Sequence, residues 1–164
     1  MTEISSIERL KQFLEADGLL LEGGSPDACI QQFQTSNGVH IPKDLASYFS
    51  EIDGTKGNYA IGMIRFWGIG EVERLSNVIP RASVGGSATI QSSYSEPIEN
   101  GNNYFFFADC QYEAQVYAIR LTQEAGGNDV IMLNGDKPKV VAKSLSEFIE
   151  FYIDHPEKIG VTMD

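Results

Sequence analysis

The sequence predicts a single α+β domain, in which a central, twisted and mostly antiparallel sheet is flanked by N-terminal helices and a C-terminal helix. Apolar residues recur at spacings of three and four in three segments before the strand-like segments and in one after them, as amphipathic helices require. From residue 104 onward, short strand-like segments are separated by turns, which favours antiparallel hairpins over parallel crossovers. The 164 residues fit one domain over 1–164, with a core of about 5–155 and a loose tail over 157–164.

Three helices are predicted before the first strand, over residues 5–16, 25–35 and 42–52. Ser5 and Glu8 form a capping box, in which each side chain satisfies a backbone N–H at the start of a helix. Ser25 is the expected N-cap of the second helix, because Pro26 fits the first helical position. The third helix begins at Pro42 for the same reason. The link between the first two helices, Leu19–Leu21, is expected to be short and buried.

Five strands and a last helix complete the prediction. The strands are expected over residues 59–67, 104–109, 115–121, 130–133 and 139–142. Apolar residues change parity within 59–67, which predicts a bulge or burial on both faces. Residues 76–103 are rich in Ser, Gly and Asn, and a loop of that length is either functional or a disordered connector. Ser144 and Glu147 form a second capping box, and His155-Pro156 ends that helix.

The net charge of the chain limits the classes of partner that it is expected to bind. With 12 Lys and Arg against 23 Asp and Glu, the formal net charge is -11. Binding to nucleic acid depends on basic side chains that release counterions, and anionic membranes attract basic segments, so neither is an expected partner. A basic protein is the natural electrostatic complement. The alternative is that the acidity serves solubility alone.

The cysteine content and the N-terminus predict a cytoplasmic protein. Two cysteines, Cys29 and Cys110, make no disulfide framework and suit a reducing compartment. The N-terminal residues show no basic region followed by an apolar run, as a signal peptide would. The longest strongly apolar run, Tyr104–Ala108, is far too short to span a bilayer.

No segment carries a strong catalytic or cofactor motif, so we expect a protein that is not an enzyme and holds no cofactor or metal. Gly68-Ile69-Gly70 suggests a dinucleotide loop, but Glu73 stands where the third glycine belongs and Glu71 would repel a pyrophosphate. The histidines share no ligand spacing with the cysteines. A small hydrolase that uses Glu71/Glu73, Asp109/Glu113 or Cys110 remains a remote alternative.

Several motifs in a fixed order resemble those of the SUKH superfamily, a group named after yeast regulators of cell-wall synthesis. They cover roughly residues 26–153. The matching segments are Ile30-x-x-Phe33, Gly38-Val39-His40-Ile41-Pro42-x-Asp44-Leu45, Tyr48-Phe49 with Asp53-Gly54, Ile64–Leu75, Tyr104–Asp109, Tyr117-Ala118-Ile119 and Ala142–Tyr152. One departure is the segment 110–115, CQYEAQ, which lacks the glycine-rich turn often seen there and puts the local hairpin in doubt.

The resemblance implies an α+β fold with no catalytic residues to carry over. Many bacterial members are immunity proteins that bind and block a toxin encoded beside them, and eukaryotic relatives regulate cell-wall synthesis through protein contacts. We therefore expect a non-catalytic binding domain that neutralises a basic toxin, such as a nuclease. A regulatory interaction module without a toxin partner is the alternative, and the oligomeric state stays open. The residues expected to lie together at the partner surface are Trp67, Glu71, Glu73, Asp109, Tyr112 and Glu113.

Overall fold

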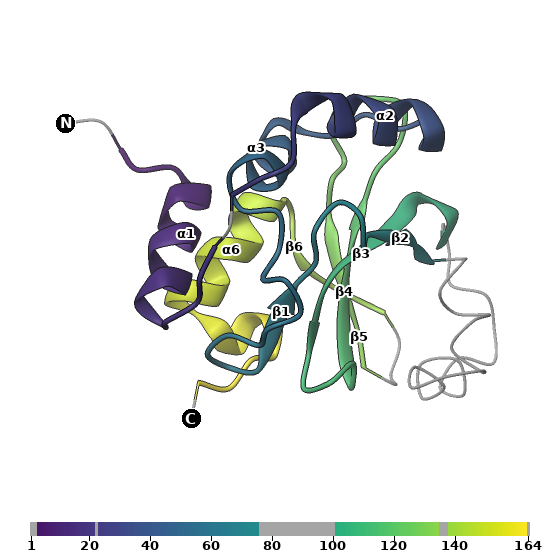
Figure 1. The fold of residues 1–164 in the computed structure, drawn as a ribbon. Helices are drawn as coiled ribbons and strands as arrows, with labels where there is room; N and C mark the ends of the chain where they lie inside the picture. The colour runs from purple at the N-terminus through teal and green to yellow at the C-terminus, as the bar shows by residue number, and fades with distance from the viewer. Residues whose placement is uncertain (1–2, 22, 76–100, 135–137, 164) are drawn as a thin grey trace.

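Six strands form one sheet in the order β1-β3-β4-β5-β6, and every pair in it is antiparallel. The computed structural model describes residues 3–21, 23–75, 101–134 and 138–163 (Figure 1). The strands are β1 (Ile64–Phe66), β2 (Glu73–Arg74), β3 (Tyr104–Cys110), β4 (Gln115–Arg120), β5 (Val130–Leu133) and β6 (Lys139–Ala142). The short β2 pairs with β3 beside β1, so both occupy the same edge of β3. The predicted α+β class with an antiparallel sheet is confirmed.

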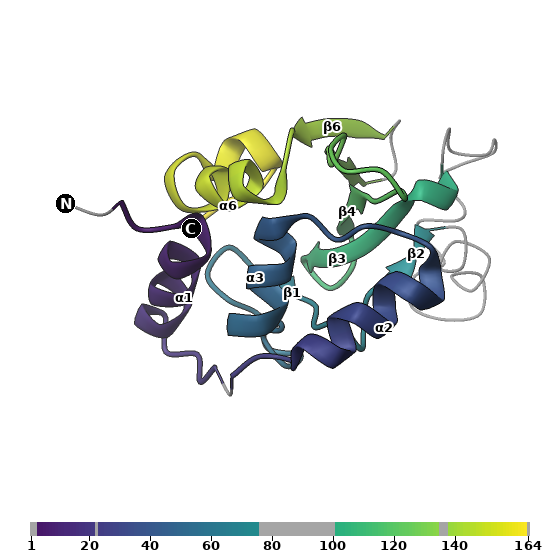
Figure 2. The same cartoon turned by 90° about the horizontal axis from the view of Figure 1, so that it is seen from above.

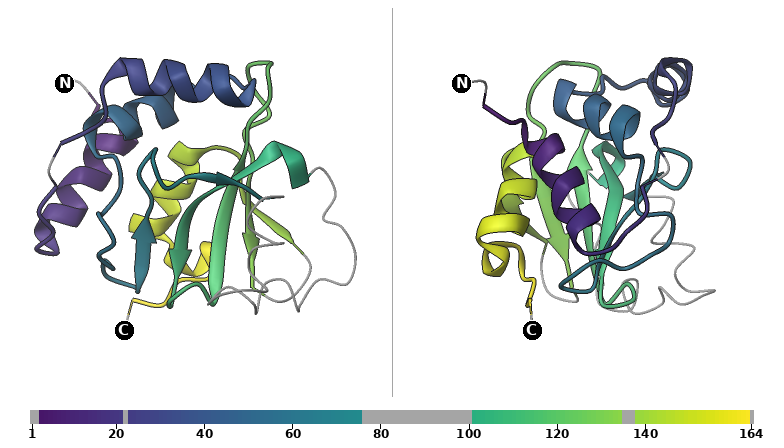
Figure 3. Two further views of the ribbon diagram at one scale, coloured as in Figure 1. Left: turned by 45° about the vertical axis from the view of Figure 1, so that its right-hand side comes forward. Right: turned by 60° about the vertical axis from the view of Figure 1, so that its left-hand side comes forward.

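Four helices accompany the sheet: α1 (Ser6–Ala16), α2 (Asp27–Asn37), α3 (Lys43–Glu51) and α6 (Leu145–Asp154). Two of their N-caps are as predicted, because Ser5 Oγ accepts from Glu8 N and Ser144 Oγ accepts from Glu147 N, each at 3.1 Å. Helices α1 and α6 lie side by side (Figures 1 and 2). Helix α2 lies across one end of the strands (Figure 3). No helix among the described residues is long and apolar enough to cross a membrane.

Asp44 joins two of these helices at their N-termini. Its Oδ2 accepts from Ser146 N at 2.9 Å and from Ser146 Oγ at 3.0 Å, so a side chain of α3 satisfies a backbone donor at the start of α6. Ser6 of α1 donates to the same Ser146 hydroxyl at 3.0 Å. Asp44 lies in one of the segments that resemble the family, and its role in this structure is to hold the N-terminus of α6 against α3.

The two faces of the sheet carry two separate apolar clusters. The main core includes buried residues of α1, α2, α3 and α6 with Phe105 and Phe107 of β3. The second cluster includes Phe106 and Val116 and contains no residue of those four helices. The register of β3 against β4 shifts between Phe106 and Ala108, which marks a β-bulge. Because a bulge reverses the alternation of side chains, Asp109 pairs with Val116 on the second face.

Four expectations from the sequence are corrected by the structure. The segment expected as one strand over 59–67 turns sharply at Gly62, where Ala60 N donates to Ile64 O at 2.7 Å and only β1 is extended. The link Leu19–Leu21 is only partly buried, since Leu20 is 88% exposed while Leu19 and Leu21 are half-buried against the main core. Helix α2 is not capped by Ser25, whose hydroxyl donates to Asp53 at 2.5 Å. Strand β2, Glu73–Arg74, was not among the five predicted strands.

The C-terminal segment predicted as a loose tail is docked on the sheet. Residues Pro156–Ile159 form a 3₁₀ turn, η2, and Ile159 is fully buried. The Tyr117 hydroxyl donates to Ile159 O at 2.5 Å, and Gln115 Nε2 donates to Gly160 O at 3.0 Å. The tail prediction failed because these partners on β4 lie more than 40 residues away in the sequence. Most of the predicted loop, 76–100, lies outside the described residues, and Gly101–Asn103 form the 3₁₀ turn η1.

Candidate partner-binding surface

A buried carboxylate organises the centre of the predicted surface. Asp109 is fully buried, and three side chains from the segment before β2 donate to it. Tyr59 Oη lies 2.8 Å from Oδ1, while Arg65 Nε at 2.8 Å and Trp67 Nε1 at 2.6 Å reach Oδ2. Arg65 Nη2 also approaches Oδ2 at 2.8 Å. Burying a charge is tolerated where it is paired and hydrogen-bonded, and all of these donors meet that need.

The acid–base properties of the donors follow from this pairing. Burial raises the pKa of Tyr59, and the hydrogen bond to Asp109 raises it further. Partial burial by itself would lower the pKa of Arg65, but the hydrogen bond and charge of Asp109 outweigh it, so the pKa is raised. Tyr59 therefore stays a donor and Arg65 stays a cation across the physiological pH range.

The cluster extends from Asp109 to the turn between β3 and β4. Arg65 Nη2 lies 3.7 Å from Glu113 Oε1, and its guanidinium carbon lies 5.1 Å from the centroid of the Tyr59 ring. The rings of Tyr59 and Tyr112 are 4.8 Å apart. Tyr112 itself is 72% exposed. Arg65 and Tyr59 thus connect the buried carboxylate to an exposed aromatic side chain.

The hairpin that lacks turn glycines forms nevertheless. Gln111, Tyr112 and Glu113 all have positive φ, at 54°, 56° and 69°, which is a conformation that L-residues seldom adopt. Ala114 N donates to Gln111 O at 3.2 Å within this turn. Strands β3 and β4 therefore pair although three residues that are not glycine occupy the left-handed region in the turn.

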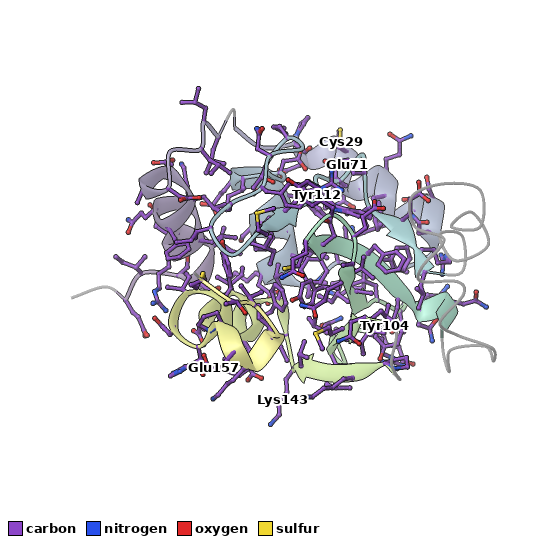
Figure 4. All side chains as sticks on the ribbon, turned by 90° about the horizontal axis from the view of Figure 1, so that it is seen from below. Cys29, Glu71, Tyr104, Tyr112, Lys143 and Glu157 are labelled. Carbon is purple, nitrogen blue, oxygen red and sulfur yellow. The ribbon has the colours of Figure 1, made fainter. Side chains whose placement is uncertain are left out.

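The two other predicted residues lie farther along the edge of β3. Glu73 is opposite Phe106, whereas Arg65 is opposite Asp109, a separation of about 10 Å along an extended strand. Glu71 is exposed, and its Oε1 accepts from Gly68 N at 3.1 Å. Figure 4 places Glu71 on the same side of the molecule as Tyr112, with Lys143 and Glu157 on the opposite side. The structure therefore joins Trp67, Asp109, Tyr112 and Glu113 through shared neighbours. Glu71 lies on the same side of the molecule, and Glu73 lies farther along β3.

The loop that carries Trp67 and Glu71 is fixed to the end of α3. The Tyr48 hydroxyl donates to Trp67 O at 2.7 Å, and Ile69 N donates to Asp53 Oδ1 at 2.7 Å. Burial strongly raises the pKa of Tyr48, and the charge of Asp53 adds to the increase, so its hydroxyl stays protonated. Two hydrogen bonds from buried or half-buried groups hold this loop in one conformation.

Two glycines allow the close approach between the same segments. A Cβ placed on Gly54, where φ is +85°, would lie 2.4 Å from Gly68 N and 2.8 Å from Trp67 C. Both neighbours are backbone atoms, so neither can rotate out of the way. Asp53-Gly54 follows the helix predicted over 42–52, and the structure shows that this pair also positions the loop at 67–71.

Sequence reasoning missed Tyr59 and Arg65, both of which donate directly to Asp109. A signal for Arg65 was present, because a charged residue lies between the apolar residues of β1 and needs an opposite charge if its guanidinium is buried. No comparable local signal exists for Tyr59, which reaches Asp109 across 50 positions of sequence.

The chemistry of the cluster suits recognition, and the thiol beside it lacks the properties of a nucleophile. Cys110 is buried, and burial together with the charge of Asp109 raises its pKa to about 11. A nucleophilic cysteine needs the opposite, a lowered pKa and access. Among the described residues, no three His, Cys, Asp or Glu side chains gather in a way that could hold a metal ion.

The two cysteines should therefore react at very different rates. At pH 8 in the folded protein, we expect a thiol reagent to modify the exposed Cys29 and to modify Cys110 on the order of a hundredfold more slowly, because few Cys110 thiols are ionised. Labelling followed by peptide mass spectrometry measures both rates. In denaturant the two rates should converge. Equal rates in the folded protein would contradict the burial of Cys110.

A family model described as "SMI1 / KNR4 family (SUKH-1)" matches residues 24–150, which is 127 of the 164 residues. The matched range contains α2, α3, the whole sheet and the first part of α6. It also contains Asp53-Gly54, the loop at 67–71 and Asp109 with its three donors. No curated protein matches the chain.

Proposed function

The chain belongs to the SMI1/KNR4 family (SUKH-1), and from that premise we propose that it is an immunity protein, which binds a basic toxin domain in the cytoplasm and neutralises it. Family membership supports the broader statement, that this is a protein-interaction domain. The toxin partner is the finer part of the proposal.

The observation that carries the proposal is the net charge of -11. Toxins that cleave nucleic acid are basic where they bind phosphate, so an acidic protein both attracts such a domain and competes with its substrate. Opposite charge speeds association, and buried aromatic contacts slow release. Both cysteines are free, which suits the reducing compartment that we propose.

The fixed geometry of the surface supports tight binding. Asp109, Asp53 and Tyr48 hold the exposed segments through hydrogen bonds of 2.6–2.8 Å. A surface that is already ordered loses less conformational entropy when a partner binds. Neutralisation of a toxin requires slow release, and preorganisation is one route to it.

The proposal is tested by purifying the tagged chain from its host and identifying stoichiometric partners by mass spectrometry. We expect a basic toxin domain, whose expression alone arrests growth and whose effect is relieved when this chain is expressed with it. A toxin that stays equally harmful in the presence of the chain would refute the proposal. Recovery of cell-wall regulators alone would favour the regulatory module.

The acids beside Trp67 should act on the rate of association with that toxin. Replacing Glu71 and Glu73 together by Gln is expected to lower the association rate constant about threefold to tenfold at low salt and to weaken its salt dependence, because steering depends on charge. The Gln at position 71 keeps an oxygen that can accept from Gly68 N. Stopped-flow or biosensor kinetics at several salt concentrations provide the measurement.

A second double substitution, as a control, distinguishes the effect of charge at positions 71 and 73 from the effect of the net charge. Glu150 and Glu157 are exposed, and Glu157 lies on the side of the molecule opposite Glu71 (Figure 4). Replacing both by Gln changes the net charge by the same amount. If this control slows association as much as the Glu71 and Glu73 substitutions do, then those two acids have no special place in the interface.

A further inference from the structure

Three exposed apolar residues lie in two turns that meet at one end of the sheet. Among the described residues six large apolar side chains are exposed, and three of them are Ile61 at 39%, Met63 at 39% and Tyr112 at 72%. The surface made by these three residues with Tyr59 and Glu113 is called the tip surface below. Clustered exposed apolar groups mark interaction sites, whereas scattered ones need no explanation.

The two turns are joined into one unit by the backbone. Gln111 N donates to Met63 O at 2.9 Å, and Cys110 Sγ lies 3.4 Å from Gly62 O. The ring contact between Tyr59 and Tyr112 crosses the same junction. On the other side, the Tyr152 hydroxyl of α6 donates to Ile61 O at 2.7 Å. The tip surface therefore rests on the core and does not depend on a free loop.

The backbone of these turns is unusual for the residues that it carries. Of the six non-glycine residues with positive φ in the described chain, four lie here, namely Met63, Gln111, Tyr112 and Glu113. Glycine would adopt this conformation without steric cost. Residues held in such conformations cluster at ligand-binding positions, and here the strained backbone displays Tyr112 and Met63 to solvent.

The charges around the tip surface are mainly negative. Asp17 Oδ2 accepts from Ile61 N at 2.8 Å, and Glu113 lies at the base of Tyr112. Arg65 contacts Glu113 at 3.7 Å and Asp109 at 2.8 Å. Two carboxylates, those of Asp109 and Glu113, thus contact one guanidinium beside an exposed tyrosine ring. A third, that of Asp17, lies at the turn that carries Ile61. The exposed face of the Tyr112 ring and the nearby carboxylates together attract a cation of a partner.

We propose that the tip surface is the anchor for a basic segment of the protein partner, with an Arg or Lys side chain stacked on Tyr112 and directed toward Glu113. The aliphatic part of that side chain packs against Ile61 and Met63. The inference deepens the proposed function, on which it rests for the class of partner, by naming the surface and the chemistry of the anchor. Tyrosine and arginine are the residues that most often dominate interface energies.

The probe is a defined peptide, acetyl-Arg-Arg-Gly-Arg-Arg-amide, titrated into the ¹⁵N-labelled full chain at low salt. We expect the largest chemical-shift changes at the amides of residues 60–63 and 110–114. Tyr112→Ala should weaken binding of the peptide at least fivefold, while Tyr112→Phe should retain it because the ring is kept. Val140→Ala, at an exposed position of β6 on the far edge of the sheet, should leave the affinity unchanged.

The inference is overturned if the shifts centre on Glu71 and Glu73, or if Tyr112→Ala binds the peptide as tightly as the wild type. Its failure is distinguishable from failure of the immunity proposal. If the wild type and Tyr112→Ala neutralise a toxin equally, the tip surface is not the anchor, but the immunity proposal stands. If the peptide binds at the tip surface but the chain protects against no toxin, the binding surface stands and the immunity proposal fails.

Discussion

Replacing Asp109 by Ala is expected to destabilise the protein by about 3–5 kcal/mol, the range found when one partner of a buried ion pair is removed. Asp109 is fully buried and accepts from Tyr59, Arg65 and Trp67. Its loss leaves the half-buried Arg65 without this carboxylate and leaves the donors of two aromatic residues unsatisfied. The segment 59–67 then has fewer contacts that hold it against β3.

The measurement is urea denaturation followed by the fluorescence of Trp67. Because Trp67 is the single tryptophan of the chain, and its Nε1 lies 2.6 Å from Asp109, its emission reports on this cluster directly. We expect a lower midpoint and a changed emission of the folded state in Asp109→Ala. A shifted midpoint with an unchanged emission would show that the stability loss arises elsewhere.

Asp109→Asn should be milder and provides the first control. Its side-chain oxygen can still accept from Trp67, and its amide can donate to the Tyr59 hydroxyl, so the main loss is the charge opposite Arg65. We expect a cost of about 1–2 kcal/mol, typical of a weakened charge-assisted hydrogen bond. Glu124→Ala, at an exposed acid, should change stability by less than about 0.5 kcal/mol. Equal stability of Asp109→Ala and Glu124→Ala would contradict the structural role of the carboxylate.

Gly54→Ala is expected to cost about 3–5 kcal/mol, as the sum of a left-handed backbone penalty and an overpacking penalty. The added Cβ would lie 2.4 Å from Gly68 N, which is a backbone atom and cannot rotate away. The end of α3 and the loop at 67–71 must therefore separate. Tyr48 and Asp53, which bind that loop through hydrogen bonds, would lose their geometry in the same movement.

Gly57→Ala isolates the part of the effect that comes from the close approach. Gly57 has a φ of +82°, nearly the same as the +85° of Gly54, but a Cβ there meets no atom within 4 Å. Its replacement should cost about 1–2 kcal/mol, the backbone penalty alone. Thermal and urea denaturation of both variants measure the difference. If the two variants lose the same stability, the packing of residue 54 against residue 68 does not constrain the fold.

The candidate surface could be predicted only in part, because its members come from segments far apart in the sequence. The predicted set includes Trp67, Asp109, Tyr112 and Glu113, which the structure joins through shared neighbours. The two residues that join them, Tyr59 and Arg65, were not predicted. Apolar periodicity identifies a strand, but it does not say which side chain of that strand reaches a buried acid 44 or 50 positions away.

Residue 25 shows how tertiary contacts overrule a local preference. Ser25 precedes Pro26 and suits an N-cap, yet α2 begins at Asp27 with Pro26 as its N-cap. The Ser25 hydroxyl donates to Asp53 at 2.5 Å, and Ser25 N donates to Phe49 O at 2.8 Å. The Ser25 hydroxyl was expected to cap α2 but bonds to Asp53 instead. The packing of the segment before α2 against the end of α3 decided which of these two bonds forms.

The sequence by itself determined the elements whose signals are local. Ser5 and Ser144 cap their helices as predicted, because capping involves residues only three positions apart. The strands at 130–133 and 139–142 have the predicted bounds. Tertiary structure alone decided which face of the sheet Asp109 occupies, since the bulge after Phe106 reverses the alternation that the sequence pattern assumes. That one-residue shift moves Asp109 from the face of Phe105 and Phe107, which the helices cover, to the face of Val116. There Tyr59, Arg65 and Trp67 donate to it.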